Sequence, residues 1–197
     1  MNTAEIFAGH LDQHLRAASA MPALAGPVAD AAKALIECLG GGGTVYTCGN
    51  GGSAADAQHL VGELIGRYRR ERRPLRAVSL AADPTVWTCI ANDYRAEDVF
   101  ARQLAALAGP GDLVAAFTTS GDSANVVEAL KAAKGRGAKT VLFGGAQAGR
   151  AGVYADCPLL APAQSTPRVQ ELHTLMLHMI SEVVDAWAAG ELQEGWT

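Results

Sequence analysis

The chain has 197 residues, of which 49% are hydrophobic and 18% charged, and its formal net charge is −4. This length and composition fit one domain, or one domain with a helical extension, and the slightly acidic balance argues against nucleic acid or an anionic membrane as a general partner. No charged-then-apolar leader opens the sequence, and no apolar run reaches the length of about 18 residues that spans a bilayer. We therefore expect a soluble, cytoplasmic protein.

Two helices are predicted before any strand. Apolar residues at helical spacing predict a helix over residues 3–20, and Met21-Pro22 interrupts the pattern. A second helix is predicted over residues 27–39, with Pro27 in its first turn, where proline is tolerated. Residues 1–39 are therefore expected to form a helical extension. Since such a leading pair in an otherwise alternating chain often packs on a neighbouring subunit, we expect that contact here.

From residue 40 onward, strands and helices alternate. The apolar runs predict strands over residues 44–48, 76–80, 112–118, 139–143 and 157–160. The periodic segments predict helices over residues 53–70, 84–107 (interrupted near Asn92-Asp93), 123–134 and 167–189. This alternation predicts a parallel, doubly wound α/β domain over residues 40–189, followed by a frayed tail over residues 190–197.

A glycine-rich loop, residues 48–53, follows the first predicted strand and leads into a helix. Glycines let the backbone approach a ligand, and the N-terminus of the helix favours an anion. Ser53 is expected to cap this helix, with Asp56 completing a weak capping box. His59 and Glu63, four residues apart, share a helical face and form either an acid–base or metal pair or an ordinary surface pair.

A second loop, residues 118–123, carries four hydroxyl side chains after another strand. Hydroxyls at a helix N-terminus suit a phosphate, although they could simply cap a turn. In a doubly wound sheet, ligands bind at the C-terminal ends of the strands where the strand order reverses. Both loops are therefore expected to meet at one binding site.

A dinucleotide site is the alternative for the first loop, because residues 49–54 match the G-x-G-x-x-G/A fingerprint. That fingerprint also expects an acidic residue about 20 residues further on, whereas the nearest one here, Asp83, lies about 30 residues past the loop. It also leaves the second loop unexplained. We therefore expect no nucleotide cofactor.

The last helix carries a second set of polar side chains. Gln170 and His178 are eight residues apart and lie on roughly the same side, whereas His173 points away and is interpreted as a packing or hydrogen-bonding residue. His178 lies among apolar residues and is either functional or a neutral core histidine, an alternative that the residues alone leave open. The neighbouring residues interpreted as core are Met176, Met179 and Ile180.

Two further groups have structural interpretations. The basic segment 67–73 is interpreted as a solvated helix end, with a subunit or substrate-phosphate contact as the alternative. The cysteines lack CxxC spacing and are interpreted as small buried residues in a reducing compartment: Cys38, Cys48, Cys89 and Cys157.

Five ordered motifs together resemble the phosphoheptose isomerases, a family with the sugar-isomerase (SIS) fold. The motifs are residues 48–59, Glu63 with Gly66-Arg67-Tyr68, Ala91-Asn92-Asp93, the loop 119–126, and Arg168-x-Gln170-Glu171-x-His173 with His178. The resemblance covers about residues 40–188 and implies a five-stranded parallel sheet and a homotetramer with active sites between subunits. The implied reaction converts D-sedoheptulose 7-phosphate to D-glycero-D-manno-heptose 7-phosphate, the first step towards nucleotide-activated heptose.

The resemblance also implies roles for individual residues. Glu63 resembles the general base and His178 the general acid of an isomerisation through a cis-enediol. The residues that match the zinc set of some members are His59, Glu63, Gln170 and His178. The residues that match substrate-contacting positions are Asn50, Gly51, Gly52, Ser53, Glu63, Asn92, Asp93, Thr118, Thr119, Ser120, Ser123 and Gln170.

This chain departs from the family pattern at three places. Arg95 follows the Asn-Asp-aromatic run at a position where the family usually has glycine. Asp122 adds a negative charge to the expected phosphate loop. After the strand predicted over residues 139–143, Phe143-Gly144-Gly145 replaces the usual Leu-Thr-Gly. The alternative function is a non-catalytic SIS module that binds a phosphosugar or a protein, like the replication-initiator-associated relatives. Those relatives lack the glutamate and the terminal histidine that this chain keeps, which favours the enzyme. An isomerase for another sugar phosphate also stays open.

Overall fold

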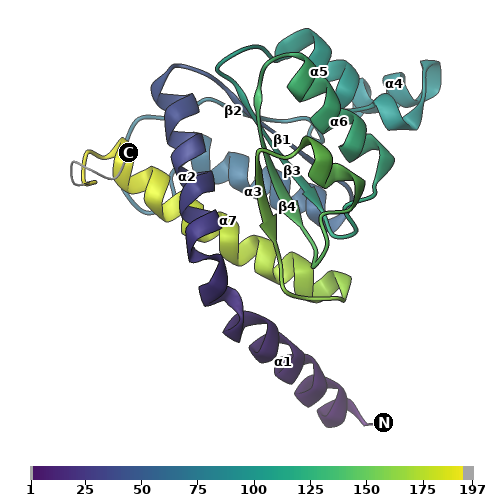
Figure 1. Ribbon diagram of the computed structural model, residues 1–197, viewed down its shortest axis with the longest axis vertical. Helices are drawn as coiled ribbons and strands as arrows, with labels where there is room; N and C mark the ends of the chain where they lie inside the picture. Colours follow the sequence, from purple (N-terminus) through teal and green to yellow (C-terminus); the bar gives the residue numbers. More distant parts are fainter. Residues whose placement is uncertain (1, 193–197) are drawn as a thin grey trace.

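The computed structural model describes residues 2–192 and has a five-stranded parallel sheet between two layers of helices (Figure 1). The strands lie in the order β2-β1-β3-β4-β5, which reverses between β1 and β3 as in other doubly wound sheets. The expected fold, with its leading helical pair, is confirmed. The strands are β1 (Val45–Gly49), β2 (Ala77–Ser79), β3 (Leu113–Thr118), β4 (Lys139–Gly144) and β5 (Cys157–Leu160).

The helices divide between the two faces of the sheet. One face is covered by α2 (Ala25–Gly40), α3 (Gly52–Ile65) and α7 (Thr166–Ala188), and the other by α4 (Pro84–Asp93), α5 (Ala101–Leu107) and α6 (Ala124–Gly135). Residues of β3 alternate between the faces: Phe117 packs in the first layer and Ala116 in the second. Both are fully buried, which explains the continuous apolar run of this strand. Short 3-10 turns lie at Met21–Leu24, Ala96–Asp98 and Gly149–Tyr154.

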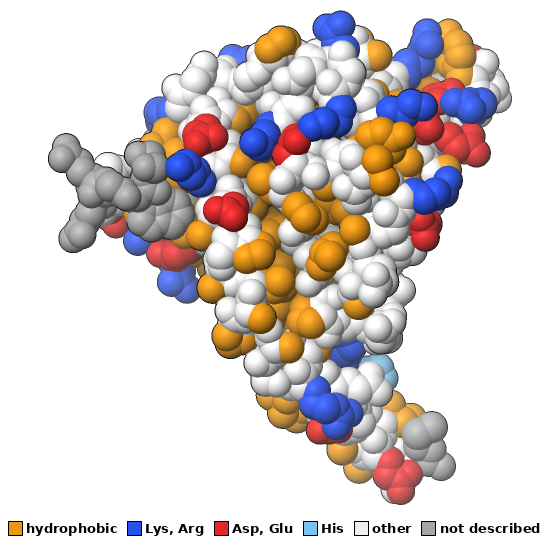
Figure 2. Space-filling model, in the orientation of Figure 1, with side chains coloured by type: hydrophobic (Ala, Val, Ile, Leu, Met, Phe, Trp, Pro, Cys, Tyr) orange, Lys and Arg blue, Asp and Glu red, His pale blue; other side chains and the backbone are white. Residues whose placement is uncertain are grey.

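Helix α1 (Thr3–Ser19) projects from the body of the molecule (Figure 1). A capping box between Asn2 and Glu5 stabilises its N-terminus. Its middle contacts α7: Arg168 donates to the His10 carbonyl, and His14 Nδ1 lies 2.8 Å from Glu171 Oε2. Figure 2 shows hydrophobic side chains across the middle of this face and others along the projecting helix. Apolar side chains of α1 that are 42% to 70% exposed are Ile6, Phe7, Leu11 and Leu15.

The predicted end of the third helix was wrong. Helix α3 ends at Ile65 rather than at residue 70, and the basic segment 67–73 crosses to α7 instead of forming a solvated helix end. The backbone N–H groups of Arg69 and Arg70 donate to the Asp185 carboxylate, which fixes a non-helical course. The predicted boundary at residue 40, between the helical extension and the α/β domain, stays a prediction. Within residues 2–192, no helix is long and apolar enough to cross a bilayer.

Two smaller predictions also need correction, for Met179 and for the cysteines. Met179 is 41% exposed because it lies on the outer side of α7, whereas Met176 and Ile180 are buried as expected. Cys89 is exposed on α4 and Cys157 is only partly buried, while Cys38 and Cys48 are buried; all four thiols are free. The frayed tail over residues 190–197 stays a prediction: Glu191 accepts a hydrogen bond from Arg70, and residues 193–197 lie outside the described part.

Candidate active site

The glycine loop after β1 forms one wall of a cavity. Gly51 has a φ of 55° and is the N-cap of α3, a backbone conformation that favours glycine. A Cβ on Gly52 would lie 2.6 Å from Gln170 Nε2, so the absence of a side chain lets α7 approach the loop. Ser53 is buried within the first turn of α3 and does not cap it, and Asp56 accepts from Thr174 Oγ1 at 2.9 Å, so the expected capping box was wrong.

The hydroxyl loop after β3 forms the opposite wall. Thr118 Oγ1 lies 3.2 Å from Ser123 Oγ and 3.5 Å from Ser120 Oγ, so these hydroxyls cluster where α6 begins. The two loops meet at the switch between β1 and β3, around a cavity of about 290 Å³ that we call the hydroxyl cup. The predicted substrate residues that line it are Asn50, Gly51, Gly52, Ser53, Thr118, Thr119, Ser123 and Gln170.

The charge of Asp122 is directed to a cation outside the cup. Its carboxylate accepts from the backbone N–H of Arg150 at 2.9 Å and lies 3.4 Å from Arg150 Nε. Asp122 is not among the residues that line the hydroxyl cup. This departure from the family pattern therefore leaves the cup suited to an anion.

Beyond the cup, side chains of α3 and α7 converge on one point. His59 Nε2 lies 3.0 Å from Glu63 Oε1 and 3.3 Å from His178 Nε2, and one ligand atom from each residue lies within 4.8 Å of the others. The His59 side chain is 40% exposed and that of Glu63 is 18% exposed, so a small molecule can reach them. We call these three residues the catalytic trio, after the roles that the family resemblance implies for Glu63 and His178; these roles stay predictions.

The buried ring of His173 fixes α7 on the sheet. Its Nε2–H donates to the Gly144 carbonyl at 2.9 Å, and the rings of Phe117 and Phe143 contact it edge-on at 5.9 Å between centroids. Burial lowers the pKa of His173 from 6.5 to about 4, so the ring is neutral at physiological pH. Its interpretation as a packing and hydrogen-bonding residue is confirmed.

Asn92 and Asp93 are not brought to the hydroxyl cup of their own chain. Both are exposed at the end of α4, where Asn92 Nδ2 donates to Asp93 Oδ1 at 2.8 Å. Arg95 has a φ of −124°, so this loop needs no glycine there, and its guanidinium pairs with Asp98 at 2.6 Å.

The sequence reasoning missed three residues of the site. Asn125 and Asn50 exchange two amide hydrogen bonds of 2.8 and 2.9 Å, which join the two loops, and Thr166 lines the hydroxyl cup. Tyr68 lies against the His178 ring at 5.6 Å between centroids. Asn125 and Tyr68 stood in the recognised motifs, whose spacing could have pointed to them.

Asn50 also lines an adjoining, more apolar cavity of about 310 Å³ beside Trp87.

Comparison with known proteins identifies the family. The family model described as the SIS domain matches residues 11–145. The phosphoheptose isomerase of Aliarcobacter butzleri is 45% identical over 159 residues, which cover 81% of this chain and 84% of the relative. This chain belongs to the phosphoheptose isomerase family.

Solved phosphoheptose isomerases share the whole architecture. The structure from Neisseria gonorrhoeae has a TM-score of 0.89 at 36% identity, covering 94% of this chain and 100% of that one. The structure from Francisella tularensis has a TM-score of 0.91 at 32% identity, covering 94% and 99%. Membership of the phosphoheptose isomerases confirms the expected isomerase activity and SIS fold. The roles of individual residues stay predictions.

Proposed function

We propose that this phosphoheptose isomerase family member converts D-sedoheptulose 7-phosphate to D-glycero-D-manno-heptose 7-phosphate, the first step towards nucleotide-activated heptose. The observation that carries the proposal is that one pair of helices joins the hydroxyl cup to the catalytic trio. Ser53 and Gln170 line the cup, and His59 and His178 follow them by six and eight residues on α3 and α7. At 1.5 Å per residue these separations are about 9 and 12 Å, which suits the length of an extended seven-carbon chain.

The phosphate would lie in the hydroxyl cup, where the side chains of Thr118, Thr119 and Ser123 donate hydrogen bonds. The N-termini of α3 and α6 add their favourable electrostatic potential for an anion. Asn50, whose amide is oriented by its hydrogen bonds with Asn125, would donate hydrogen bonds to the sugar hydroxyls and accept hydrogen bonds from them. Fixing the phosphate in this way orients carbons 1 and 2 towards the catalytic trio.

Glu63 and His178 would then move the protons. Glu63 Oε1 faces His59, so Oε2 remains to take the proton from carbon 1 of the ketose and to return it to carbon 2. His178 would donate a proton to the oxygen on carbon 2 and accept one from the hydroxyl on carbon 1. Between these transfers the substrate is a cis-enediol, and the sum is the aldose with no net gain or loss of protons.

The catalytic trio also fits a divalent metal ion. His59 Nε2 carries one hydrogen or one lone pair, yet it faces both a carboxylate oxygen and a second imidazole nitrogen, as in a ligand shell. Two imidazoles and a carboxylate are a zinc-type donor set, to which Gln170 would add a weaker amide oxygen. A zinc ion bound there would act as a Lewis acid on the carbonyl oxygen. Full activity after metal is removed and shown absent would exclude a required ion.

We further propose a cytoplasmic homotetramer with active sites between subunits. The exposed apolar side chains of α1 support contact with a second chain. The partial exposure of His59 leaves the catalytic trio accessible to a second chain as well. Asn92 and Asp93 are exposed and lie outside the hydroxyl cup of their own chain, so they are available to a neighbouring subunit's site. The free thiols are consistent with a reducing compartment.

The test is to incubate the purified protein with sedoheptulose 7-phosphate and to follow aldose formation. Glu63→Gln and His178→Gln should each lower kcat by about 10² to 10⁴-fold, the usual contribution of a positioned acid or base. Glu71→Gln is the matched control, because the Glu71 side chain is 93% exposed on the segment after α3. Unchanged turnover in both variants would overturn the roles, and a wild-type protein inactive even with added zinc would favour a non-catalytic SIS module.

A further inference from the structure

A buried guanidinium closes the C-terminal end of α3. The Arg72 side chain is 1% exposed, and its Nη atoms donate to the carbonyls of Glu63, Leu64 and Gly66 at 2.5, 2.8 and 3.1 Å. The last four carbonyls of a helix lack intrahelical partners, and this one side chain satisfies two of them, those of Glu63 and Leu64, as well as the carbonyl of the C-cap residue Gly66. The Glu63 carbonyl in that turn belongs to the residue that we propose as the general base.

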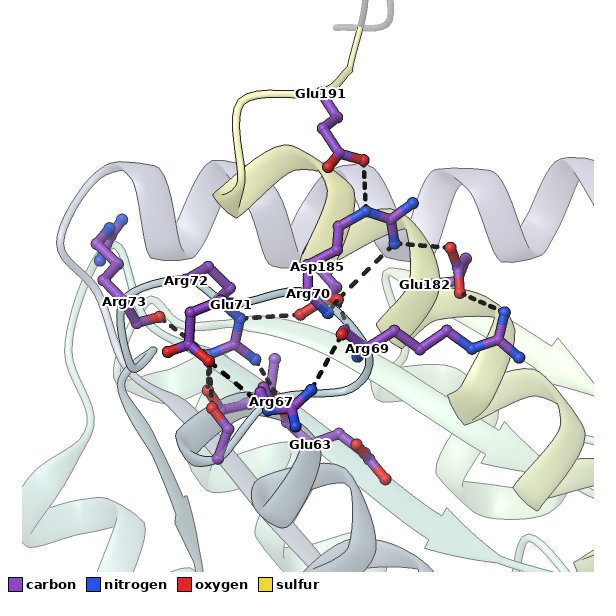
Figure 3. Close-up of polar contacts among 12 residues, drawn as sticks. Glu63, Arg67, Arg69, Arg70, Glu71, Arg72, Arg73, Glu182, Asp185 and Glu191 are labelled. Atoms are coloured by element: carbon purple, nitrogen blue, oxygen red, sulfur yellow. Dashed lines mark hydrogen bonds and ion pairs between the residues drawn. The ribbon is translucent and has the colours of Figure 1, made fainter.

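A single carboxylate of α7 holds the other side of this arginine. Asp185, also 1% exposed, accepts from Arg72 Nε at 3.0 Å through Oδ1 and from the backbone N–H groups of Arg69 and Arg70 at 3.0 and 2.7 Å through Oδ2. Figure 3 shows Arg72 and Asp185 pointing toward each other beside the end of α3. Burial alone would raise the pKa of Asp185, but hydrogen bonds from the backbone of Arg70 and Arg69 and from Arg72 hold the pKa below its usual value, so the group is charged.

This buried pair differs from the ion pairs around it. Arg69 and Glu182 are 69% and 38% exposed, and Arg67 and Glu71 are 57% and 93% exposed. Exposed pairs of this kind contribute little to stability or to geometry. Arg72 and Asp185 are desolvated and fully hydrogen-bonded, so their contacts are specific in direction as well as in charge.

Both residues proposed for proton transfer adjoin the segment that this pair holds on α7. Glu63 lies in the turn of α3 that Arg72 closes. Tyr68 packs against the His178 ring, with an angle of 32° between the ring planes, and directly precedes the two N–H groups that Asp185 binds. Asp185 itself follows His178 by seven residues, two turns along α7. The pair therefore links the end of α3, the Tyr68 segment and α7 at one point.

We propose that Arg72 and Asp185 are positioning residues, which lock the last turn of α3 and residues 66–73 onto α7 and so hold Glu63 and the Tyr68-supported ring of His178 in the alignment needed for proton transfer. The proposal rests on the catalytic roles proposed above for Glu63 and His178. Neither positioning residue lines the hydroxyl cup, so binding of the sugar phosphate does not depend on them.

The kinetic test uses Asp185→Asn, with Glu182→Gln as the control one turn earlier on α7. The amide keeps the shape of the carboxylate but places an N–H beside one of its donors. Since a displacement of about 1 Å can cost about 10²-fold in rate, Asp185→Asn should lower kcat by 10 to 100-fold while KM changes less than about twofold. Glu182→Gln should leave both constants unchanged, and Arg72→Lys, which loses the planar fork, should behave like Asp185→Asn.

A spectroscopic readout separates positioning from simple loss of stability. The Tyr68 ring should shift the NMR signal of the His178 ring hydrogens, which His178→Gln assigns by its disappearance. Folded Asp185→Asn should move that signal, and Glu182→Gln should not. Arg72→Lys, which disrupts the same buried pair from the other side, serves if Asp185→Asn fails to fold, and it should reproduce both the shift and the loss of kcat.

The outcomes are distinct for the two proposals. A kcat within about twofold of wild type in folded Asp185→Asn, or in Arg72→Lys where the former does not fold, overturns the positioning role. An unmoved His178 signal in the same variant also overturns it. Wild-type turnover in Glu63→Gln and His178→Gln would instead remove the proposed catalytic roles, whatever the behaviour of Asp185→Asn.

Discussion

Protonation of His173 is expected to destabilise the fold within a defined pH window. Burial lowers the pKa of this histidine from 6.5 to about 4 in the folded protein. As the pH falls below 6.5, the unfolded chain therefore binds a proton before the folded chain does, and stability is lost progressively down to about pH 4. A pKa difference of about 2.5 at about 1.4 kcal/mol per pH unit gives about 3.5 kcal/mol in all for this one ring, of which about 3 kcal/mol is lost by pH 4.

The matched variant is His173→Gln, whose side-chain N–H can still donate to the Gly144 carbonyl but does not titrate. Urea unfolding of both proteins at the same chain concentration, at steps between neutral pH and pH 4, gives the free energy of unfolding at each pH. The wild type should lose about 3 kcal/mol more than the variant across this range. An equal loss in both proteins would refute the reasoning, because the buried ring would then not be held neutral.

Three further changes follow from the site and the surface. Gly52→Ala should raise KM about tenfold while the protein stays folded, because the new Cβ would displace the flexible Gln170 amide from the hydroxyl cup; an unchanged KM would contradict this contact. Asp122→Asn should change KM less than about twofold, because Arg150 already pairs with the carboxylate, and a large fall in KM would show that Asp122 opposes the phosphate. Phe7→Glu combined with Leu11→Glu should reduce the mass measured by light scattering without loss of helical circular dichroism, whereas an unchanged mass would exclude assembly through α1.

The strands could be predicted because each is a continuous apolar run between glycine or polar segments. The strand predicted over residues 112–118 is β3 (Leu113–Thr118), and the other strands agree within a few residues. The end of α3 could not be predicted in this way. Its course after Gly66 is set by Asp185, which lies 115 residues from Arg70 in the sequence, so no local pattern records it.

In the candidate site, too, relations within one helix could be predicted from the sequence, whereas contacts between elements could not. Spacing alone placed His59 beside Glu63, and Gln170 on the side of His178, because helical periodicity fixes those relations. The two helices meet through tertiary contacts: Gln170 packs closely against Gly52, and the buried His173 ring bonds to the Gly144 carbonyl. The direction of Asp122 likewise depends on Arg150, 28 residues away, and Ser53 lost its capping role because Gly51 takes the N-cap position.

Helix α7 carries residues of all three proposed parts of the site on one unbroken stretch: Gln170 at the cup, His178 in the catalytic trio and Asp185 at the buried pair. A single residue inserted between Gln170 and His178 would rotate everything beyond it by about 100° around the helix axis. The proposed contact at the cup and the proposed proton donor could then no longer face the same substrate. Lengths of loops elsewhere can drift in evolution, but the count of residues from Gln170 to Asp185 is expected to be invariant among active relatives.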